Sequence, residues 1–304
     1  MIILKILLAS SVIMELIDIN YDEFINEFHE LCCVKARENT KHETIVRIGN
    51  WRNKNVALKN CYRKSEALLY SNIRPHPNIV RLLTIIYQTI PEKKKPRTYI
   101  LMEANDGVTL ADTAMYNVYS LFDVLYIMIE ITKGLQHLHS CGFIHHDIKR
   151  SNILVVDKDK LNKLDTVDKT NKLKESDDDY ESYFEEGDDI SQYLDFKICD
   201  FGLSEYIDSN GCGSEKFRNC GTKLYLAPEK TKGSSIPITS KVDIFAMGVL
   251  GTNLMNPDES SSDIDVYNRI MDVCKSVDLV NRYTAEQLLD QLTLLQIRAR
   301  AKLY

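Results

Sequence analysis

The sequence predicts an α+β fold in which strands come first along the chain and helices follow. Two observations lead to this prediction. Between residues 44 and 104, short apolar runs rich in β-branched residues alternate with polar turns, which is typical of strands. From Ser120 onward, apolar residues recur at helical spacing over much longer segments. The chain has 304 residues, enough to bury a substantial core as one large domain or two smaller lobes.

The first third of the chain predicts several strands and one short helix. Residues 44–59 indicate two strands around a polar turn at residues 49–55, because β-branched and other apolar residues lie on both sides of it. Residues 65–73 suit a short helix, and residues 79–87 and 98–104 each have the composition of a strand.

The second part of the chain predicts a long helix, a hairpin and further helices. The long helix begins near Ser120 and ends near Cys141, where a glycine follows. NILVV at residues 152–156 and DFKICDFG at residues 195–202 predict the two strands of one hairpin. From Lys241 the pattern becomes helical again.

The segment between the two hairpin strands, residues 157–192, breaks the pattern. It is first mixed in charge and then strongly acidic, with almost no apolar periodicity. Such a segment cannot bury enough apolar surface to offset the entropy lost on ordering, so we predict a disordered acidic insertion. Its two ends must still lie close together, because the strands on either side belong to one hairpin.

Composition excludes several classes of function. A net charge of −6 and an isoelectric point near 5.7 argue against a general nucleic-acid-binding protein, which needs clustered Lys and Arg. The eight cysteines show neither zinc-site spacing nor a disulfide framework, which fits a reducing intracellular compartment. We therefore expect the cytoplasm, with the nucleus as a second location.

The N-terminal residues 1–13 are apolar and superficially resemble a signal peptide. Met14 then opens a polar segment, so an upstream extension of the open reading frame is the alternative that we prefer. No later segment approaches the roughly 20 apolar residues of a membrane-spanning helix, and we expect no membrane partner.

A short polar stretch, FIHHDIKRSNILV, carries side chains suited to phosphoryl transfer. Moving a phosphoryl group from a nucleotide to a hydroxyl needs an acceptor for the hydroxyl proton, a cation near the phosphate and oxygen ligands for Mg²⁺. Asp147, Lys149 and Asn152 offer these parts in that order. Asp200, the first residue of a DFG sequence, offers a second carboxylate for the metal. Each of these residues alone is weak evidence for phosphoryl transfer.

Combined with other motifs, this stretch resembles the catalytic loop of the eukaryotic-type protein kinase family. The motifs occur in the family's order: VALK, a glutamate, HPNIV, HxDxKxxN, DFG, APE, DxFxxG and an arginine within RYTAEQLL. The resemblance covers nearly the whole chain from about Leu31 to Leu289. It implies a two-lobed protein kinase-like fold, with a small β-rich N-lobe at residues 21–104, a helical C-lobe at residues 105–304 and ATP in the cleft between them. Residues 1–20 would be an N-terminal extension.

The resemblance implies catalytic and metal-binding roles. Asp147 corresponds to the catalytic base, and Lys149 corresponds to the lysine that contacts the γ-phosphate. Asn152 and Asp200 correspond to the Mg²⁺ ligands, so the implied cofactors are ATP and Mg²⁺. The segment DIKRSN is the serine/threonine form of its motif, and Thr222 in GTKLYLAPE agrees with it.

The resemblance also implies a nucleotide site. Lys59 of VALK would contact the α- and β-phosphates, and Glu66 would pair with this lysine across a short connection. The residues implied around adenine are Ala57 and Leu154 as a sandwich, Met102 as gatekeeper, and Glu103 and Asn105 as the hinge.

Three further residues have structural roles in the family. Glu229 of APE and Arg282 are expected to form a buried ion pair that ties the activation segment to the C-terminal helices. Asp243 is expected to brace the catalytic loop.

The sequence departs from the family where a glycine-rich loop should cover the phosphates. Counting back from VALK places that loop at RENTKH, residues 37–42, and Gly49 falls in the wrong place to serve it. Either Arg37, Lys41 or His42 contacts the phosphates by charge, or nucleotide binding is weak and the domain is a scaffold. Because the catalytic set is otherwise complete, we favour an active enzyme with a raised KM for ATP.

His146 is the second departure, because kinases switched on by activation-loop phosphorylation usually carry arginine before the catalytic aspartate. A guanidinium grips a phosphate with two hydrogen bonds, whereas an imidazole is mostly neutral near pH 7. We therefore expect activity that does not depend on a phosphorylated loop. The plainer alternative is that His146 only packs.

The resulting hypothesis is a serine/threonine kinase that transfers the γ-phosphate of ATP to protein substrates. The alternative is a pseudokinase scaffold that binds partner proteins with weak or no turnover. A regulatory partner protein fits either hypothesis, and nucleic acid fits neither. An excess of Ile, Lys, Asn, Asp and Tyr over Gly and Pro indicates an AT-rich genome, as in a large DNA virus or a divergent parasite. For a virus, the location would be the host cell.

Overall fold

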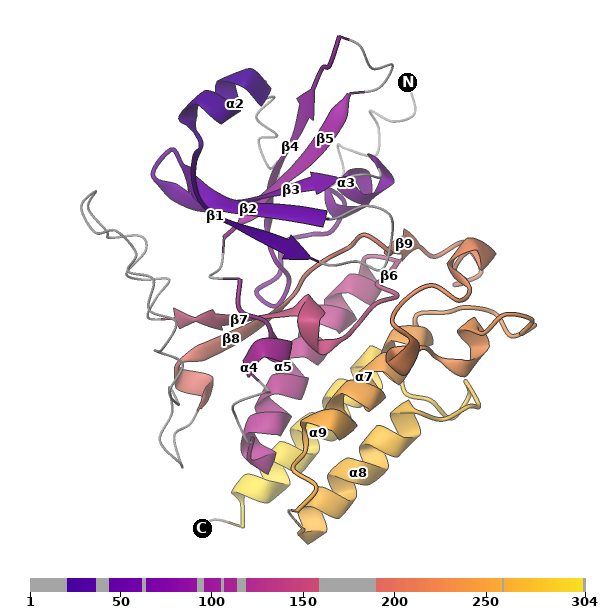
Figure 1. Ribbon diagram of the computed structural model, residues 1–304. Coiled ribbons are helices and arrows are strands. Elements are labelled where there is room, and N and C mark those ends of the chain that lie inside the picture. The colour runs from indigo at the N-terminus through magenta and orange to yellow at the C-terminus, as the bar shows by residue number, and fades with distance from the viewer. Residues whose placement is uncertain are drawn as a thin grey trace. The chain divides into compact units, whose positions relative to one another are not determined.

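The computed structural model describes residues 21–36, 44–61, 64–91, 96–104, 107–113, 119–158, 190–258 and 260–302 (Figure 1). The chain divides into two compact units, one of residues 1–67 with 81–104 and the other of residues 68–80 with 105–304. The first unit holds a five-stranded sheet, and the second holds the long helices. The predicted two-lobed α+β fold is therefore confirmed.

The sheet of the first unit is antiparallel, with the strand order β1-β2-β3-β5-β4. Its strands are β1 (His29–Ala36), β2 (Thr44–Trp51), β3 (Lys54–Cys61), β4 (Leu82–Gln88) and β5 (Arg97–Glu103). The predicted strands between residues 44 and 104 are all present, and the predicted short helix is α3 (Lys64–Tyr70). Strand β1 was not predicted.

The turn between β2 and β3 is shorter than predicted. It consists of Arg52 and Asn53, whose positive φ angles of 50° and 60° match the right-handed twist of a tight hairpin. The predicted turn at residues 49–55 was wrong because Gly49 lies inside β2. A Cβ atom on Gly49 would lie 2.5 Å from the carbonyl oxygen of His29 and from the ring of Phe28, so this glycine permits close packing.

Helix α2 (Tyr21–Glu27) precedes the sheet and belongs to its core, although the sequence did not predict it. Phe24 of α2 is fully buried, and Tyr21 stacks on Tyr99 with 4.9 Å between ring centroids. Trp51 donates from its indole nitrogen to Glu27 at 3.1 Å. The core cluster consists of Phe24, Phe28, Trp51, Val56, Leu58, Ile86, Tyr99 and Leu101.

The second unit is built mainly from helices. These are α4 (Leu110–Thr113), α5 (Leu121–Ser140), α7 (Lys241–Leu254), α8 (Ser262–Cys274) and α9 (Ala285–Arg300). Helix α5 packs against α7 and α9, and α8 packs against α7 and α9 (Figure 1). The predicted helical pattern after residue 241 is therefore confirmed.

Helix α5 begins and ends where the sequence predicts. The side chain of Ser120 accepts from the backbone N–H of Asp123, and the Asp123 carboxylate accepts from the backbone N–H of Ser120. This capping box satisfies donors that the first turn leaves unpaired. Cys141 is the C-cap, and Gly142 follows with a φ of 81° that favours glycine.

The predicted hairpin is formed by β7 (Ile153–Asp157) and β8 (Leu194–Ile198), which pair in antiparallel register. The predicted insertion at residues 157–192 was too wide, because Asp157 is part of β7 and residues 190–192 form a 3₁₀ helix. Ile190 is only 4% exposed, so an apolar side chain is buried shortly before β8. Residues 159–189 lie outside the described residues.

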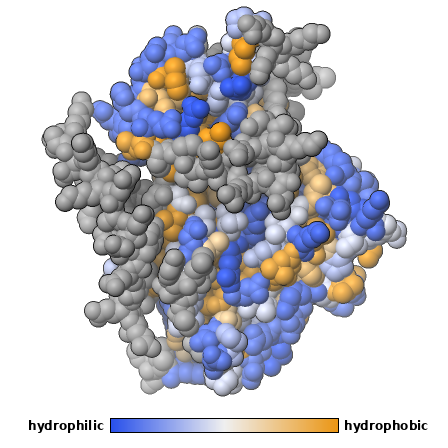
Figure 2. Space-filling model, viewed as in Figure 1, coloured by the Kyte–Doolittle hydropathy of each residue, from blue (hydrophilic) through white to orange (hydrophobic). Residues whose placement is uncertain are grey.

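The face of the molecule seen in Figure 2 is mainly hydrophilic, with hydrophobic residues in small separate groups. Within the part of the chain that the structure describes, no helix combines the length and the apolar character needed to cross a membrane.

Candidate active site

The first part of the site is a polar loop that follows the buried strand β6 (Phe143–Ile144). In this loop, Lys149 Nζ lies 2.7 Å from Asp147 Oδ2 and donates to Thr222 Oγ1 at 3.1 Å. Thr222 donates to Asp147 Oδ1 from its backbone N–H at 3.0 Å and from its hydroxyl at 2.8 Å. The structure therefore brings together a carboxylate, an ammonium and a hydroxyl from segments that are far apart in sequence.

The charge on Asp147 is stabilised by its neighbours. Burial would raise the pKa of this carboxyl group, but the ammonium of Lys149 and the hydrogen bond from Thr222 outweigh burial and lower the pKa. Asp147 is therefore an ionised carboxylate at neutral pH. It can orient a hydroxyl group and accept its proton.

Asn152 is held against Asp147, and the residue before Asp200 contacts Asn152. Asn152 ends the 3₁₀ helix η1 (Arg150–Asn152), and its amide nitrogen donates to the carbonyl oxygen of Asp147 at 2.8 Å and to Asp147 Oδ2 at 3.0 Å. Its Oδ1 is therefore the atom that can bind a cation. The backbone N–H of Cys199 donates to the carbonyl of Asn152 at 3.0 Å, which places Asp200 next to this loop.

Oxygen donors of this kind fit Mg²⁺, which prefers hard ligands. Across the described ranges, no group of three or more His, Cys, Asp or Glu side chains could hold a metal ion by itself. A magnesium ion at Asn152 and Asp200 would therefore complete its coordination with phosphate oxygens or water, as is usual for this metal.

Asp243 of α7 fixes the backbone of the loop. Its carboxylate accepts from the backbone N–H groups of His145 and His146, each at 2.8 Å, and from His139 Nε2 at 2.9 Å. Burial would raise the pKa of Asp243, but the hydrogen bond from His139 and nearby charges outweigh it and hold the pKa well below its usual range. The predicted bracing role agrees with these contacts.

The first unit holds an ion pair between β3 and α3. Lys59 Nζ lies 2.6 Å from Glu66 Oε1, and both side chains are buried. The second carboxylate oxygen of Glu66 accepts from the thiol of Cys61 at 3.3 Å. Because Lys59 and Cys61 are two residues apart on a strand, they face the same side of the sheet.

The residues predicted around adenine are only partly described. Ala57 is buried in β3 and pairs with Met102 of β5, and Glu103 ends the same strand. Leu154 lies in β7 within the second unit. Asn105 and the whole of RENTKH, residues 37–42, lie outside the described residues, so these assignments stay predictions.

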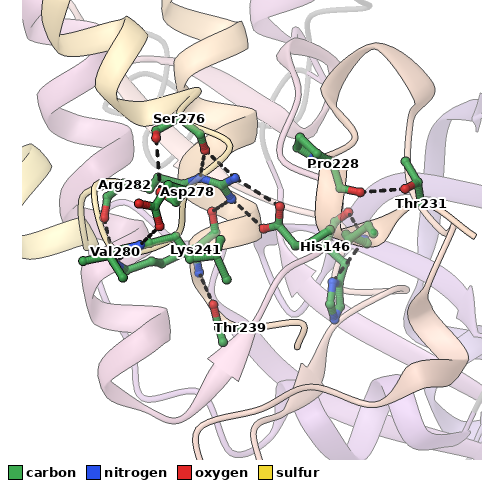
Figure 3. Close-up of polar contacts among 12 residues, drawn as sticks. His146, Pro228, Thr231, Thr239, Lys241, Ser276, Asp278, Val280 and Arg282 are labelled. Carbon is green, nitrogen blue, oxygen red and sulfur yellow. Dashed lines mark hydrogen bonds and ion pairs between the residues drawn. The ribbon is translucent and has the colours of Figure 1, made fainter. Parts of the chain in front are cut away.

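The predicted ion pair between Glu229 and Arg282 is present and buried. Arg282 donates to the two carboxylate oxygens of Glu229 at 2.5 and 3.0 Å. The guanidinium also donates to the carbonyl oxygens of Ser276 and Lys241, so it lies at the centre of several backbone contacts (Figure 3). The resemblance to the kinase family was sufficient to predict this pair.

Several contacts of the site were missed from the sequence. The thiol of Cys61 could have been found from its strand spacing to Lys59. His146 is buried and contacts Glu205 and Lys230, and nothing in the sequence pattern pointed to either partner.

Comparison with known proteins gives a consistent result. Residues 32–293 match the family described as Protein kinase domain. A probable serine/threonine-protein kinase of Dictyostelium discoideum is 27% identical over 221 residues, which are 68% of this chain and 19% of that protein. A dual specificity protein kinase of the same organism is 30% identical over 190 residues, which are 61% of this chain and 26% of that protein.

A third relative, the DNA damage response protein kinase of Saccharomyces cerevisiae, is 27% identical over 221 residues, which are 71% of this chain and 38% of that protein. The chain spans well under half of the length of each of these three relatives.

Proposed function

The chain belongs to the protein kinase family, and from this premise we propose that it is an active serine/threonine kinase that transfers the γ-phosphate of ATP to protein substrates. The observation that carries the proposal is the hydrogen-bonded group of Asp147, Lys149 and Thr222, with Asn152 beside it. A carboxylate, a cation and an oxygen ligand for Mg²⁺ meet there, and phosphoryl transfer to an alcohol needs all three.

Each side chain has a distinct task in this reaction. Asp147 orients the substrate hydroxyl and takes up its proton as the new bond to phosphorus forms. Lys149 places a positive charge where the transferred phosphoryl group carries negative charge. Lys59, held in place by Glu66, contacts the α- and β-phosphates. Bound Mg²⁺ would neutralise phosphate oxygens, and Asn152 and Asp200 are the residues that would hold it.

The direct test is transfer of radiolabelled phosphate from ATP to the protein itself and to a mixed protein substrate. Asp147→Asn should lower the rate by about 10²- to 10⁴-fold, the usual contribution of a general base. Asp195→Asn is the matched control, because Asp195 is a partly exposed aspartate that forms an ion pair with Lys158 at 3.2 Å. Equal rates for the two variants and the wild type would refute the proposal.

Serine and threonine are the proposed acceptor residues. Lys149 and Thr222, which mark the serine/threonine form of the catalytic motifs, are hydrogen-bonded to each other. Acid hydrolysis of labelled substrate followed by phosphoamino-acid separation tests this specificity. Phosphotyrosine as the main product would contradict it.

A weak affinity for ATP is the second part of the proposal. By sequence position, RENTKH replaces the family's glycines, so we expect its side chains to keep backbone N–H groups from approaching the phosphates in the usual way. We expect a KM for ATP above that of ordinary kinases, and a value in the low micromolar range would contradict this. ATP binding without any turnover would favour the scaffold alternative.

Independence from loop phosphorylation is the third part. His146 is buried, and burial lowers the pKa of its imidazole, so the ring is neutral at pH 7 and gives a phosphate group little attraction. Treatment with a phosphatase, followed by removal of the phosphatase, should leave the initial rate unchanged. Loss of activity after this treatment would overturn this part of the proposal.

A further inference from the structure

His146 takes part in a chain of buried polar contacts. Its Nε2 lies 2.9 Å from Glu205 Oε1, and its Nδ1 lies 3.2 Å from Lys230 Nζ. A carboxylate can only accept a hydrogen bond, so Nε2 must carry a proton. An ammonium can only donate, so Nδ1 must carry none. The two partners therefore select the neutral Nε2-protonated tautomer of His146.

Glu205 is the negatively charged residue in this series of contacts. It lies in β9 (Glu205–Tyr206), which pairs with β6 at the start of the catalytic loop. The same Oε1 that contacts His146 also accepts from the backbone N–H of Ser214 at 2.8 Å. The backbone of Gly213 packs so closely on this oxygen that a Cβ there would lie 2.5 Å from it. Glu205 lies in the activation segment, defined here as residues 200–229, and it joins the catalytic loop to Ser214 further along that segment.

Lys230 is the cationic member. It is 2% exposed, ends the 3₁₀ helix η5 (Pro228–Lys230), and also contacts the carbonyl oxygen of His146 at 3.4 Å. Burial lowers the pKa of Lys230, and the negative charges of Asp243, Asp147 and Glu205 oppose that decrease. Burying a charged lysine costs free energy unless nearby groups compensate its charge. Lys230 therefore depends on the negative groups around it.

The imidazole is further fixed by its surroundings. Phe217 stacks on the ring with 4.9 Å between centroids and an interplanar angle of 16°. The backbone N–H of His146 is bound to Asp243, and its φ of 71° is unusual for a residue other than glycine. His146 thus contacts the activation segment near its start through Glu205 and in its middle through Phe217, and it contacts Lys230, the residue directly after the segment.

We propose that Glu205 and Lys230 are positioning residues that hold the activation segment in place through His146 without a phosphate group. The carboxylate of Glu205 supplies the negative charge and Lys230 supplies the positive charge, and both are built into the chain. The inference rests on the proposed kinase function, and it assigns the regulation of that site to an internal contact.

The test compares variants of the two positioning residues. Glu205→Ala removes the acceptor of two hydrogen bonds and should lower kcat by about tenfold or more, with little change in the KM for ATP. Glu205→Gln keeps an oxygen at that place and should restore most of the rate. Glu215→Ala is the matched control, because Glu215 lies in the same segment but is exposed and pairs with Arg218. Equal rates for Glu205→Ala and Glu215→Ala would overturn the inference.

A second readout does not need activity. In ¹⁵N-histidine-labelled protein at pH 7, His146 should show a protonated Nε2 and an unprotonated Nδ1, with its signals identified from a His146→Gln sample. Lys230→Met should remove this preference and increase trypsin cleavage at Lys216 and Lys223 in the folded protein. A ring protonated at Nδ1 in the wild type would refute the inference, even if the variant failed to fold.

Failure of the proposed kinase function and failure of this inference would give different results. A wild-type protein that transfers no phosphate contradicts the proposed function, while the tautomer and the trypsin cleavage still test the contact chain. An active wild type whose Glu205→Ala variant keeps full activity and an unchanged cleavage pattern contradicts only the inference.

Discussion

Asp243 holds the backbone of the catalytic loop in place through a single carboxylate. One carboxylate accepts two backbone N–H groups of the catalytic loop and the ring of His139, so it fixes the loop that carries Asp147. Because the hydrogen bonds favour the ionised form, the pKa of Asp243 is lower in the folded than in the unfolded protein. Its contribution to stability is therefore present above the unfolded pKa and is lost as the pH falls toward the folded value.

We expect Asp243→Asn to lower the free energy of unfolding by about 3 kcal/mol at neutral pH, because an amide cannot replace a buried carboxylate among three donors. The difference from the wild type should be constant above about pH 5 and should shrink below about pH 4, where the wild-type carboxylate loses its advantage. Urea titrations across this pH range measure it. A difference that grows as the pH falls would contradict the assignment.

At the scale of single residues, motif order predicted the members of the site but not all of their neighbours. Asp147, Lys149 and Asn152 lie within one short loop, so spacing alone was enough to group them. Glu205 and Lys230 could not be assigned, because their contacts to His146 depend on how separate segments fold back on the loop.

At the scale of elements, helix α2 completes the hydrophobic core of the first unit, because its Phe24 packs with buried residues of the sheet. The helix is seven residues long, too short to be stable without tertiary contacts. Its burial of Phe24 against Trp51, with 5.6 Å between ring centroids, supplies such contacts.

Replacing Phe24 by alanine should lower the free energy of unfolding of the first unit by about 3–5 kcal/mol, the usual cost of removing a buried aromatic ring. The chain has one tryptophan, so Trp51 fluorescence during denaturation reports this unit directly. Asn26→Ala, an exposed change in the same helix, serves as the control. An unchanged midpoint for Phe24→Ala would show that α2 is not part of the core.

The elements that were predicted well have strong local signals. Helix α5 has a capping box and a glycine after its last turn, and strands β4 and β5 have dense β-branched and apolar runs. Helix α2 is too short for a clear periodicity. The turn between β2 and β3 contains no glycine, so its two residues with positive φ angles could not be recognised from composition.

At the scale of the whole molecule, the contact between Glu229 and Arg282 joins the end of the activation segment to the segment that precedes α9. The guanidinium also contacts the carbonyl oxygens of Lys241 and Ser276, which lie at the start of α7 and just after α8. The side chain of Arg282 therefore joins three parts of the second unit (Figure 3).

We expect Arg282→Met to lower the free energy of unfolding by about 3–5 kcal/mol, because it leaves the carboxylate of Glu229 buried without its partner. The double variant Arg282→Met with Glu229→Gln should recover part of this loss, since no uncompensated charge then remains. Urea denaturation of the four proteins in this cycle gives the coupling energy. Strictly additive losses would contradict a direct ion pair.

The position of Arg282 along the chain has a consequence for protein synthesis. Glu229 leaves the ribosome well before its partner, so a nascent chain cannot secure the end of the activation segment until residue 282 has also been made. A nascent chain that ends before residue 282 would thus contain Asp147, Lys149 and Asn152 but would lack the ion pair that holds the end of the activation segment. The ordering of this segment is therefore a step that follows the synthesis of α7 and α8.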